Sequence, residues 1–182
     1  MEFEPTRLSE VIVIRPRIYN DARGYFFESW QEERLRRAGI SARFVQDNQS
    51  HSVRGTLRGL HFQIQQPQGK LVRVTRGEVF DVVVDIRRSS PRFGEWFGRI
   101  LSDVNHEMMW IPPGFAHGYL ALSEEIDFLY KCTDYYAPEH ERSIRWDDPH
   151  IGVQWPLAAG VSPMLSGKDA VAPFLKDAET FP

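Results

Sequence analysis

Three side chains of this sequence have the chemistry to move a proton beside a carbonyl group: His61, Lys70 and Tyr130. An imidazole exchanges a proton near neutral pH, an ammonium stabilises an oxygen that becomes negatively charged, and a phenol can act as an acid. Each residue also has a structural interpretation: a hydrogen-bonded core histidine, a solvated loop lysine and a packed tyrosine. Residue type alone does not decide between the catalytic and the structural interpretation, because the decision depends on the elements that carry the side chains.

The stretch Arg58–Gln63 has the pattern of a strand. In a strand, His61 and Gln63 share one face, and the apolar residues next to them share the other. Lys70 opens a later strand after a turn, and Tyr130 ends an apolar strand. A histidine on a strand that lines the interior of a sheet structure is well placed for proton transfer at neutral pH.

Basic, aromatic and acidic side chains elsewhere are candidates for holding a ligand or orienting a base. Guanidinium forks fit phosphate oxygens, and aromatic rings can stack on a nucleobase. Asp169 could orient a histidine, as in other His–carboxylate pairs. The candidate phosphate contacts are Arg23, Arg58 and Lys168, and the candidate stacking rings are Phe26, Tyr135 and Tyr136.

The segment Ile-Pro-Pro-Gly-Phe-Ala-His-Gly at 111–118 is a turn that feeds a strand, with His117 at the first strand position. It resembles the second conserved motif of the cupin superfamily, which consists of small double-sheet barrels. Metal-binding cupins carry His-x-His and a later Glu in their first motif. The equivalent stretch here is His61-Phe62-Gln63, and Lys70 lies where an acidic ligand would be expected. A catalytic metal normally takes at least three protein ligands, so we expect no metal and no other cofactor.

Composition limits the class of protein. The 182 residues suit one domain over 1–182. A formal charge of -3 gives no general attraction for nucleic acid, and no apolar stretch approaches the roughly 20 residues of a membrane helix. The N-terminus lacks a secretory signal. Cys132 is the only cysteine, which excludes an internal disulfide and favours a reducing cytoplasm.

The pattern along the chain predicts a mainly β fold with a few short helices. Ser29 and Glu32 form a capping-box pattern that begins a helix of about three turns, with Gly39 as its stop. After about Asp147 the chain becomes a coil tail that wraps the sheets and contains a short helix over 173–177. Strands are predicted at Val11–Ile14, Leu71–Thr75, Glu78–Ile86, Trp96–Leu101, Met108–Ile111, Gly118–Leu122 and Ile126–Cys132. The second and third of these flank a tight turn and are expected to pair as a hairpin. Many short strands with tight turns imply an antiparallel sandwich or barrel.

Eight motifs occur in order along the chain and together are highly specific. They are Asp-Ala-Arg-Gly-Tyr-Phe-Phe-Glu at 21–28, Gln-Asp-Asn at 46–48, Arg-Gly-Thr-Leu-Arg-Gly-Leu-His at 54–61, Gln-Gly-Lys at 68–70, Pro-Pro-Gly-Phe-Ala-His-Gly at 112–118, Tyr-Lys-Cys-Thr-Asp-Tyr-Tyr at 130–136, Ile-Arg-Trp-Asp-Asp-Pro at 144–149 and Lys-Asp at 168–169. Over roughly Leu8 to Asp169 the sequence resembles the dTDP-4-dehydrorhamnose 3,5-epimerase family of the rhamnose pathway. The resemblance implies a cupin-like double-sheet (jelly-roll) antiparallel β-barrel.

The resemblance also assigns roles residue by residue. It implies His61 as the base, Tyr130 as the acid on the opposite face of the sugar, Asp169 as the group that orients His61, and Lys70 as the holder of the enolate oxygen. The family is homodimeric, and its N-terminal segment reaches into the neighbouring subunit's site. The positions assigned to binding of the nucleotide sugar are Arg23, Phe26, Glu28, Gln46, Asp47, Asn48, Arg58, His117, Glu141 and Lys168.

Three functions are weighed by the residues that each of them needs. The resemblance favours inversion of carbons 3 and 5 of dTDP-4-dehydro-6-deoxy-D-glucose to give dTDP-4-dehydro-L-rhamnose. A single-carbon epimerase of a secondary-metabolite pathway would use the same base and enolate stabiliser, so the sequence does not separate the two. A non-catalytic sugar-binding or metal-storing cupin is the hypothesis from another class. Binding alone does not require His61, Lys70 and Tyr130 together, which disfavours it.

Overall fold

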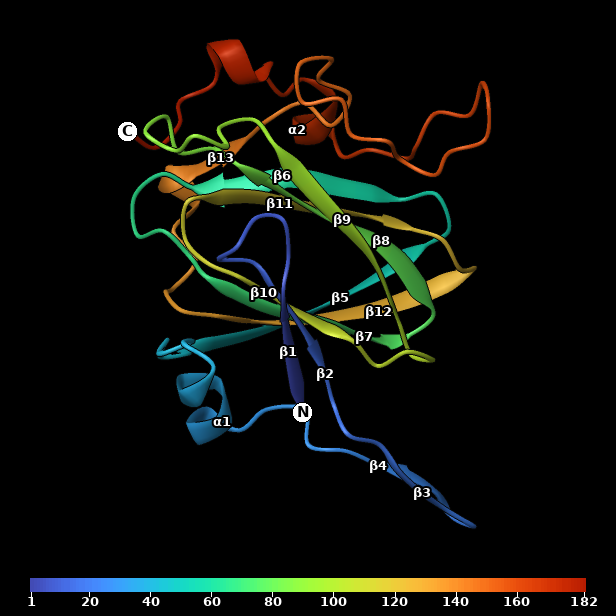
Figure 1. The fold of residues 1–182 in the computed structure, drawn as a ribbon. Helices are drawn as coiled ribbons and strands as arrows, with labels where there is room; N and C mark the ends of the chain where they lie inside the picture. Colours follow the sequence, from blue (N-terminus) through green and yellow to red (C-terminus); the bar gives the residue numbers. More distant parts are fainter.

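Two antiparallel sheets stacked face to face form the body of the molecule, as the computed structural model of residues 1–182 shows (Figure 1). The six-stranded sheet has the order β1 (Glu2–Pro5), β2 (Ile12–Arg15), β10 (Met108–Ile111), β7 (Lys70–Arg76), β12 (Glu125–Cys132), β5 (Gln46–Val53). The five-stranded sheet has the order β13 (Glu141–Ser143), β6 (Leu57–Gln63), β11 (Phe115–Ala121), β8 (Glu78–Asp85), β9 (Trp96–Ser102). A separate hairpin is formed by β3 (Tyr19–Asp21) and β4 (Gly24–Phe26). The prediction of a mainly β, antiparallel fold is confirmed. Each predicted strand is present; Met108–Ile111 has the predicted ends, and the others have shifted ends.

The inner faces of the two sheets meet in an apolar core, because the side chains of each strand alternate between inside and outside. On β12, Ile126 and Phe128 are fully buried, and the next inward residue is Tyr130. On β7, Val72 is fully buried, and the next inward residue is Lys70. The alternation that builds the core therefore also directs two polar side chains into the space between the sheets.

The outer face of each sheet is also covered. The helix α1 (Glu32–Arg37) packs buried Leu35 against the six-stranded sheet. The C-terminal segment, with α2 (Gly167–Ala170) and the 3-10 turn η2 (Leu175–Asp177), covers the five-stranded sheet through Ile151 and Leu175 (Figure 1). A second 3-10 turn, η1 (Pro138–His140), precedes β13. The predicted packing of the tail is confirmed, and the helix expected over 173–177 is a single 3-10 turn.

Helix α1 is shorter than predicted and begins at a different cap. It has six residues, and its N-cap is Gln31, whose side-chain oxygen accepts a hydrogen bond from the backbone N–H of Arg34 at 2.6 Å. The predicted capping box of Ser29 and Glu32 is therefore wrong. The Gln31 side chain is long enough to accept the hydrogen bond of the Arg34 N–H, which has no partner within the helix, so the helix begins only after Gln31. No helix of the structure has the length and apolar composition needed to cross a membrane.

The predicted hairpin of β7 and β8 is also wrong, because the two strands belong to different sheets. β7 pairs with β10 and β12, whereas β8 pairs with β11 and β9. Gly77 joins them with φ at +76°, and a Cβ there would lie 2.4 Å from the carbonyl oxygen of Glu125. A tight glycine turn between two apolar runs does not distinguish pairing within a sheet from crossing to the opposite sheet.

A bulge in β6 aligns the residues that face the space between the sheets. His61 is opposite His117 of β11, and Arg58 is opposite Tyr119, so three steps along β6 match two steps along β11. The extra residue turns both Arg58 and His61 toward the interior, although regular alternation would put them on opposite faces. Gly59 makes this possible, since it has φ at +127° and a Cβ there would lie 2.5 Å from the Cα of Gly118.

Substituting Gly59 tests this packing. We expect Gly59→Ala to lower the free energy of unfolding by about 2–4 kcal/mol, since it combines backbone strain with a clash between strands. Urea denaturation followed by circular dichroism measures the change. Gly167→Ala is the matched control, because nothing lies within 4 Å of its added Cβ. Equal stability of the two variants would show that β6 tolerates a side chain at the bulge.

Candidate active site

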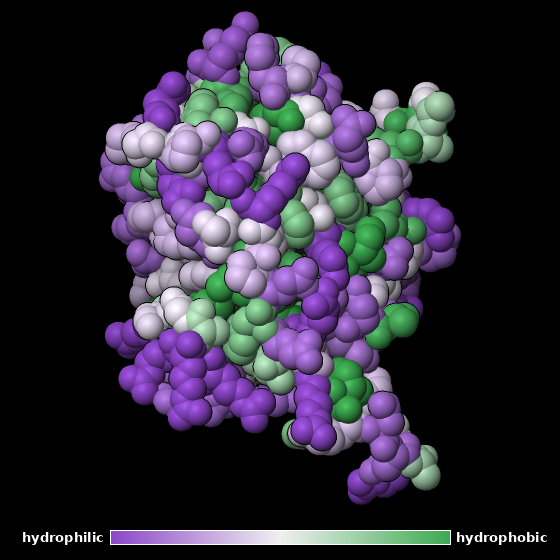
Figure 2. Space-filling model, viewed as in Figure 1, coloured by the Kyte–Doolittle hydropathy of each residue, from purple (hydrophilic) through white to green (hydrophobic).

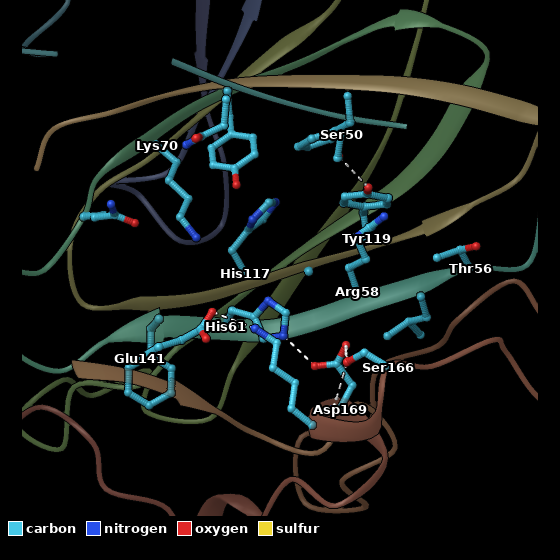
Figure 3. A pocket seen from close by; sticks show the side chains of 18 of the residues that line it. Ser50, Thr56, Arg58, His61, Lys70, His117, Tyr119, Glu141, Ser166 and Asp169 are labelled. Atoms are coloured by element: carbon cyan, nitrogen blue, oxygen red, sulfur yellow. Dashed lines mark hydrogen bonds and ion pairs between the residues drawn. The ribbon is translucent and has the colours of Figure 1, made fainter. Parts of the chain in front are cut away.

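A cavity of about 600 Å³ opens between the sheets where the inward side chains become polar (Figure 3). This volume suits a small organic ligand. Strands from both sheets line it, together with the segment that leads into α2. Among the predicted site residues, those that line the cavity are His61, Lys70, Tyr130, Asp169, Gln46, Asn48, Arg58, His117, Glu141 and Lys168. The structure thus brings together side chains that lie more than a hundred positions apart in the sequence.

His61 and Asp169 form a close pair at one wall of the cavity. The Nε2 atom of His61 lies 2.5 Å from Oδ1 of Asp169, and the Asp169 side chain is almost completely buried. Ser166 caps α2 and donates a hydrogen bond from its hydroxyl to Oδ2 of Asp169 at 2.8 Å. Burial by itself would raise the pKa of Asp169, but the hydrogen bonds from His61 and Ser166 and the charges of His61 and Lys168 hold it below its ordinary value. The carboxylate therefore stays ionised and fixes the imidazole, which leaves one ring nitrogen free to accept a proton.

Lys70 enters the cavity from the opposite sheet, as the first residue of β7. No carboxylate pairs with it, and its Nζ lies 5.9 Å from the ring centre of Tyr130. Burial lowers the pKa of Lys70, and the nearby Cys132, Asp81 and Glu141 act in the other direction. An anionic oxygen arriving in the cavity would favour the ammonium form, so this amine is suited to stabilise negative charge on a ligand.

Tyr130 is the next polar residue on the same sheet, on β12, which pairs with β7. Burial is the main cause that raises its pKa to about 12, with Cys132 and Tyr119 adding to it and Arg58 opposing it. Its hydroxyl makes no hydrogen bond to the protein. The phenol is therefore protonated at neutral pH and free to give its proton to a ligand.

These groups lie on opposite sides of the cavity. His61 and Asp169 belong to β6 and α2, and Lys70 faces them from the six-stranded sheet (Figure 3). Tyr130 belongs to the same six-stranded sheet as Lys70. A flat ring placed between the sheets would have a base on one side and an acid on the other. That arrangement suits removal of a proton from one face of a carbon and its return to the other.

His117 forms a second histidine–carboxylate pair deeper in the structure. It is the third residue of β11, not the first strand position as predicted, and its Nε2 lies 3.0 Å from both carboxylate oxygens of Asp81. Asp81 is completely buried, and burial raises its pKa against the influence of His117 and Lys70. Both cavity histidines are thus engaged by carboxylates, and no group of three or more His, Cys, Asp or Glu side chains gathers where it could hold a metal ion.

The mouth of the cavity carries a second set of polar groups. Lys168 pairs with Glu141 at 2.8 Å, and the hydroxyl of Tyr136 donates to Glu141 at 3.3 Å. On β5, Gln46 donates from Nε2 to Asn48 Oδ1 at 3.0 Å. These side chains surround the entrance and are free to contact a ligand that extends out of the cavity.

Four predicted contacts lie outside this cavity. Arg23 and Phe26 belong to the hairpin of β3 and β4, and the Phe26 side chain is 69% exposed. Glu28 follows this hairpin and pairs with Arg34 at 3.2 Å. Asp47 is on β5 but points to the other face of the sheet, where it pairs with Lys131 at 2.9 Å. Strand alternation explains Asp47, since its neighbours Gln46 and Asn48 both face the cavity.

Some residues that line the cavity or lie directly behind its lining were not predicted from the sequence. Ser50 continues the inward positions of β5, and Ser52 follows it with its side chain nearly buried. Tyr119 and Asp81 lie on the central strands of the other sheet. The alternation of polar residues over 46–52 could have identified the serines, but Asp81 sits in an apolar strand and carries no comparable signal.

The fold and the cavity define an antiparallel double-sheet protein with an acid–base pocket between its sheets. The chain belongs to the dTDP-4-dehydrorhamnose 3,5-epimerase family, whose sequence model matches residues 5–177. This confirms the resemblance seen in the sequence.

Three similar proteins illustrate the relationship. The dTDP-4-dehydrorhamnose 3,5-epimerase of Pseudomonas aeruginosa is 55% identical over 97% of this chain and 98% of its own length. The crystal structure of dTDP-6-deoxy-D-glucose-3,5-epimerase from Legionella pneumophila, in complex with dTDP-4-keto-L-rhamnose, is 54% identical with a TM-score of 0.93, covering 97% of this chain and 93% of that one. A 3'-monoepimerase from Streptomyces bikiniensis, in complex with dTDP-quinovose, is 32% identical with a TM-score of 0.88, covering 94% and 87%.

The environment of Tyr130 gives a pH-dependent prediction. Because burial raises the pKa of this phenol to about 12, it keeps its proton at pH values where a free tyrosine, with a pKa of about 10, is already ionised. We expect the phenolate absorbance of the wild type minus that of Tyr130→Phe to stay near zero at pH 10 and to rise only above about pH 11. Ultraviolet titration of both proteins, with N-acetyltyrosinamide as reference, measures this difference. A difference that develops together with the reference would contradict the raised pKa.

Proposed function

We propose that this chain is a dTDP-4-dehydrorhamnose 3,5-epimerase that converts dTDP-4-dehydro-6-deoxy-D-glucose to dTDP-4-dehydro-L-rhamnose. The observation that carries the proposal is the position of His61 with Asp169 on one side of the cavity and of Lys70 with Tyr130 on the other. The sequence similarity over nearly the whole chain to proteins named for this activity supports it.

The chemistry follows from the ketone at carbon 4 of the sugar. It acidifies the hydrogens on carbons 3 and 5, because removal of either proton gives an enolate whose charge falls on the ketone oxygen. In the proposal, His61 removes the proton, Lys70 stabilises the enolate oxygen, and Tyr130 returns a proton from the opposite face. A positioned acid or base contributes about 10²–10⁴-fold, and one oxyanion donor about 3–4 kcal/mol. These groups account for the reaction without a metal.

Two inversions require the acid and the base to be reset. After the first inversion His61 carries the proton it removed, and Tyr130 is a phenolate. Exchange with water returns both groups to their starting states before the second carbon reacts. Hydrogen that reaches carbons 3 and 5 through Tyr130 therefore originates in the solvent, which makes isotope labelling a direct readout.

The nucleotide end of the substrate would occupy the mouth of the cavity. Arg58 and Lys168 are cations there, and Gln46 and Asn48 present amide groups. Phosphate oxygens fit a guanidinium group well. Binding of the nucleotide would hold the sugar between the sheets and so contribute to positioning at the reacting carbons.

Deuterium incorporation tests the function and the role of His61. In deuterium oxide, the wild type is expected to place label at both carbons 3 and 5 of the 4-keto-6-deoxyglucose nucleotide, as seen by proton NMR. His61→Ala should reduce exchange at both carbons by at least about 10³-fold, because the base is removed. His150→Ala serves as the control and should exchange like the wild type, since its side chain is 75% exposed and lies outside the cavity. Label at one carbon only would indicate a monoepimerase, and continued exchange by His61→Ala would exclude His61 as the base.

We also propose that two copies of the chain form a homodimer in which residues near the N-terminus serve the partner's site. The hairpin of β3 and β4 projects away from the sheets (Figures 1 and 2). It carries Arg23 and leads to Glu28, and neither residue reaches its own cavity. Tyr25 and Phe26 are more than half exposed on the same projection. A projecting apolar and charged segment is well suited to a neighbouring subunit.

Mixed dimers test this arrangement. Arg23→Ala and His61→Ala should each be nearly inactive alone, yet their mixed dimer would hold one intact site if each N-terminal hairpin serves the partner. Equal co-expression makes about half of the dimers mixed, so about a quarter of wild-type activity should return. Turnover of the co-expressed mixture measures this recovery, and mixed dimers isolated through two affinity tags should show about half of the wild-type activity. No recovery in the mixed dimer would show that each hairpin serves its own subunit or none.

We infer that residues 1–182 act as one domain and that the two sheets form a cupin-like jelly roll around the cavity. The cytoplasm is the proposed compartment, supported by Cys132 as the only cysteine and a free, buried thiol.

A further inference from the structure

Three hydroxyl groups meet beside Arg58 at one wall of the cavity. The hydroxyl oxygen of Tyr119 lies 3.0 Å from Oγ of Ser50 and 3.2 Å from Oγ of Ser52. Tyr119 belongs to the five-stranded sheet and the two serines to β5 of the other, so these hydrogen bonds connect the sheets. Tyr119 and Ser52 are 4% and 5% exposed, which places them among the buried polar residues of the molecule.

This hydroxyl cluster also holds Arg58. The Nε atom of Arg58 donates to Ser52 Oγ at 3.0 Å, and one terminal nitrogen donates to the backbone oxygen of His51 at 3.2 Å. Arg58 is opposite Tyr119 in the pairing of β6 and β11. The Ser52 hydroxyl therefore lies between the guanidinium group and the Tyr119 phenol.

Arg58 differs from Arg87 and Arg99, which are bound by carboxylates, because its own partners are neutral. Arg87 donates to Asp85 and Glu10, and Arg99 donates to Glu107. The second cation at the cavity mouth, Lys168, is paired with Glu141. Arg58 has no carboxylate partner, so its positive charge remains uncompensated at the entrance of the cavity.

We propose that Ser52 and Tyr119 are positioning residues that hold the Arg58 guanidinium ready for the diphosphate of the nucleotide sugar. This rests on the proposed function. A neutral hydroxyl fixes the direction of the guanidinium through Nε without neutralising it, and it leaves terminal N–H groups for phosphate oxygens. Since an arginine side chain loses considerable rotamer freedom when it is fixed, holding it in advance removes part of that cost from ligand binding.

Packing alone does not require these hydroxyl groups. The ring of Tyr119 stacks on Phe128 with centroids 4.4 Å apart, and a phenylalanine would keep that contact. Replacing Ser52 with alanine would leave only a small void, because the substitution removes a single oxygen atom. The hydroxyls instead satisfy one another and the Nε of Arg58, and the proposal assigns their function to that last bond.

Removal of these hydroxyl groups is expected to weaken ligand binding and to change the rate of the chemical step much less. With dTDP alone as the probe, Ser52→Ala should weaken the affinity about 10-fold, because a hydrogen bond to a charged group is lost. Tyr119→Phe removes the bonds of the phenol to Ser50 and Ser52 but leaves the bond from Arg58 to Ser52, so it should weaken the affinity only about 3-fold. For the full substrate, the KM of Ser52→Ala should rise about 10-fold while kcat changes less than about 3-fold.

A double-mutant cycle separates positioning from general loosening of the sheets. If Ser52 acts through Arg58, the double variant Ser52→Ala, Arg58→Ala should bind dTDP no more weakly than Arg58→Ala alone. Ser102→Ala is the matched control, since its hydroxyl is also buried in a strand but lies outside the cavity. It should lower the melting temperature without changing the affinity for dTDP.

Calorimetry at fixed salt gives the affinities, and turnover is measured separately. Additive losses in the cycle, or an unchanged dTDP affinity in Ser52→Ala, would overturn the positioning role. A wild type that binds dTDP with the expected coupling, yet epimerises neither carbon, would support the role of Ser52 and contradict the proposed function.

Discussion

The face-to-face packing of two antiparallel sheets determines where every side chain of the cavity lies. Each strand must bury one face, and strict alternation then fixes the direction of every following side chain. On β12 the buried Phe128 determines that Tyr130 faces inward, and on β7 the buried Val72 does the same for Lys70. The apolar end of the sandwich thereby sets the geometry of its polar end.

One local departure from this regularity has a large effect on the site. The bulge at Gly59 brings Arg58 and His61 to the same face of β6, so one short strand presents a guanidinium group and an imidazole to the same cavity. The close approach of Gly59 to Gly118 holds β6 against β11 at this point. A regular strand would direct one of the two side chains away from the cavity.

The electrostatics of the cavity follow from how its charged groups are partnered. Asp169 is satisfied by His61 and Ser166 and stays ionised, which fixes the imidazole. Lys70 and Arg58 lack carboxylate partners, so both can respond to an arriving anion. The paired groups thus set the shape of the site, and the unpaired cations provide its attraction for a negatively charged substrate.

Residue types and ordered motifs predict the mainly β class, the approximate strands, and ten of the 23 residues that line the cavity. The sequence does not show that β7 and β8 lie in different sheets, because the turn between them has the same residues whether the strands pair or cross to opposite sheets. The pairing of Asp169 with His61 was implied by the family resemblance, and the structure shows it. The pairing of Asp81 with His117 and the separation of Arg23 from the cavity became visible only in three dimensions. Such contacts depend on how distant strands stack, and the free energy that selects a stacking comes from the whole buried core and not from any one segment.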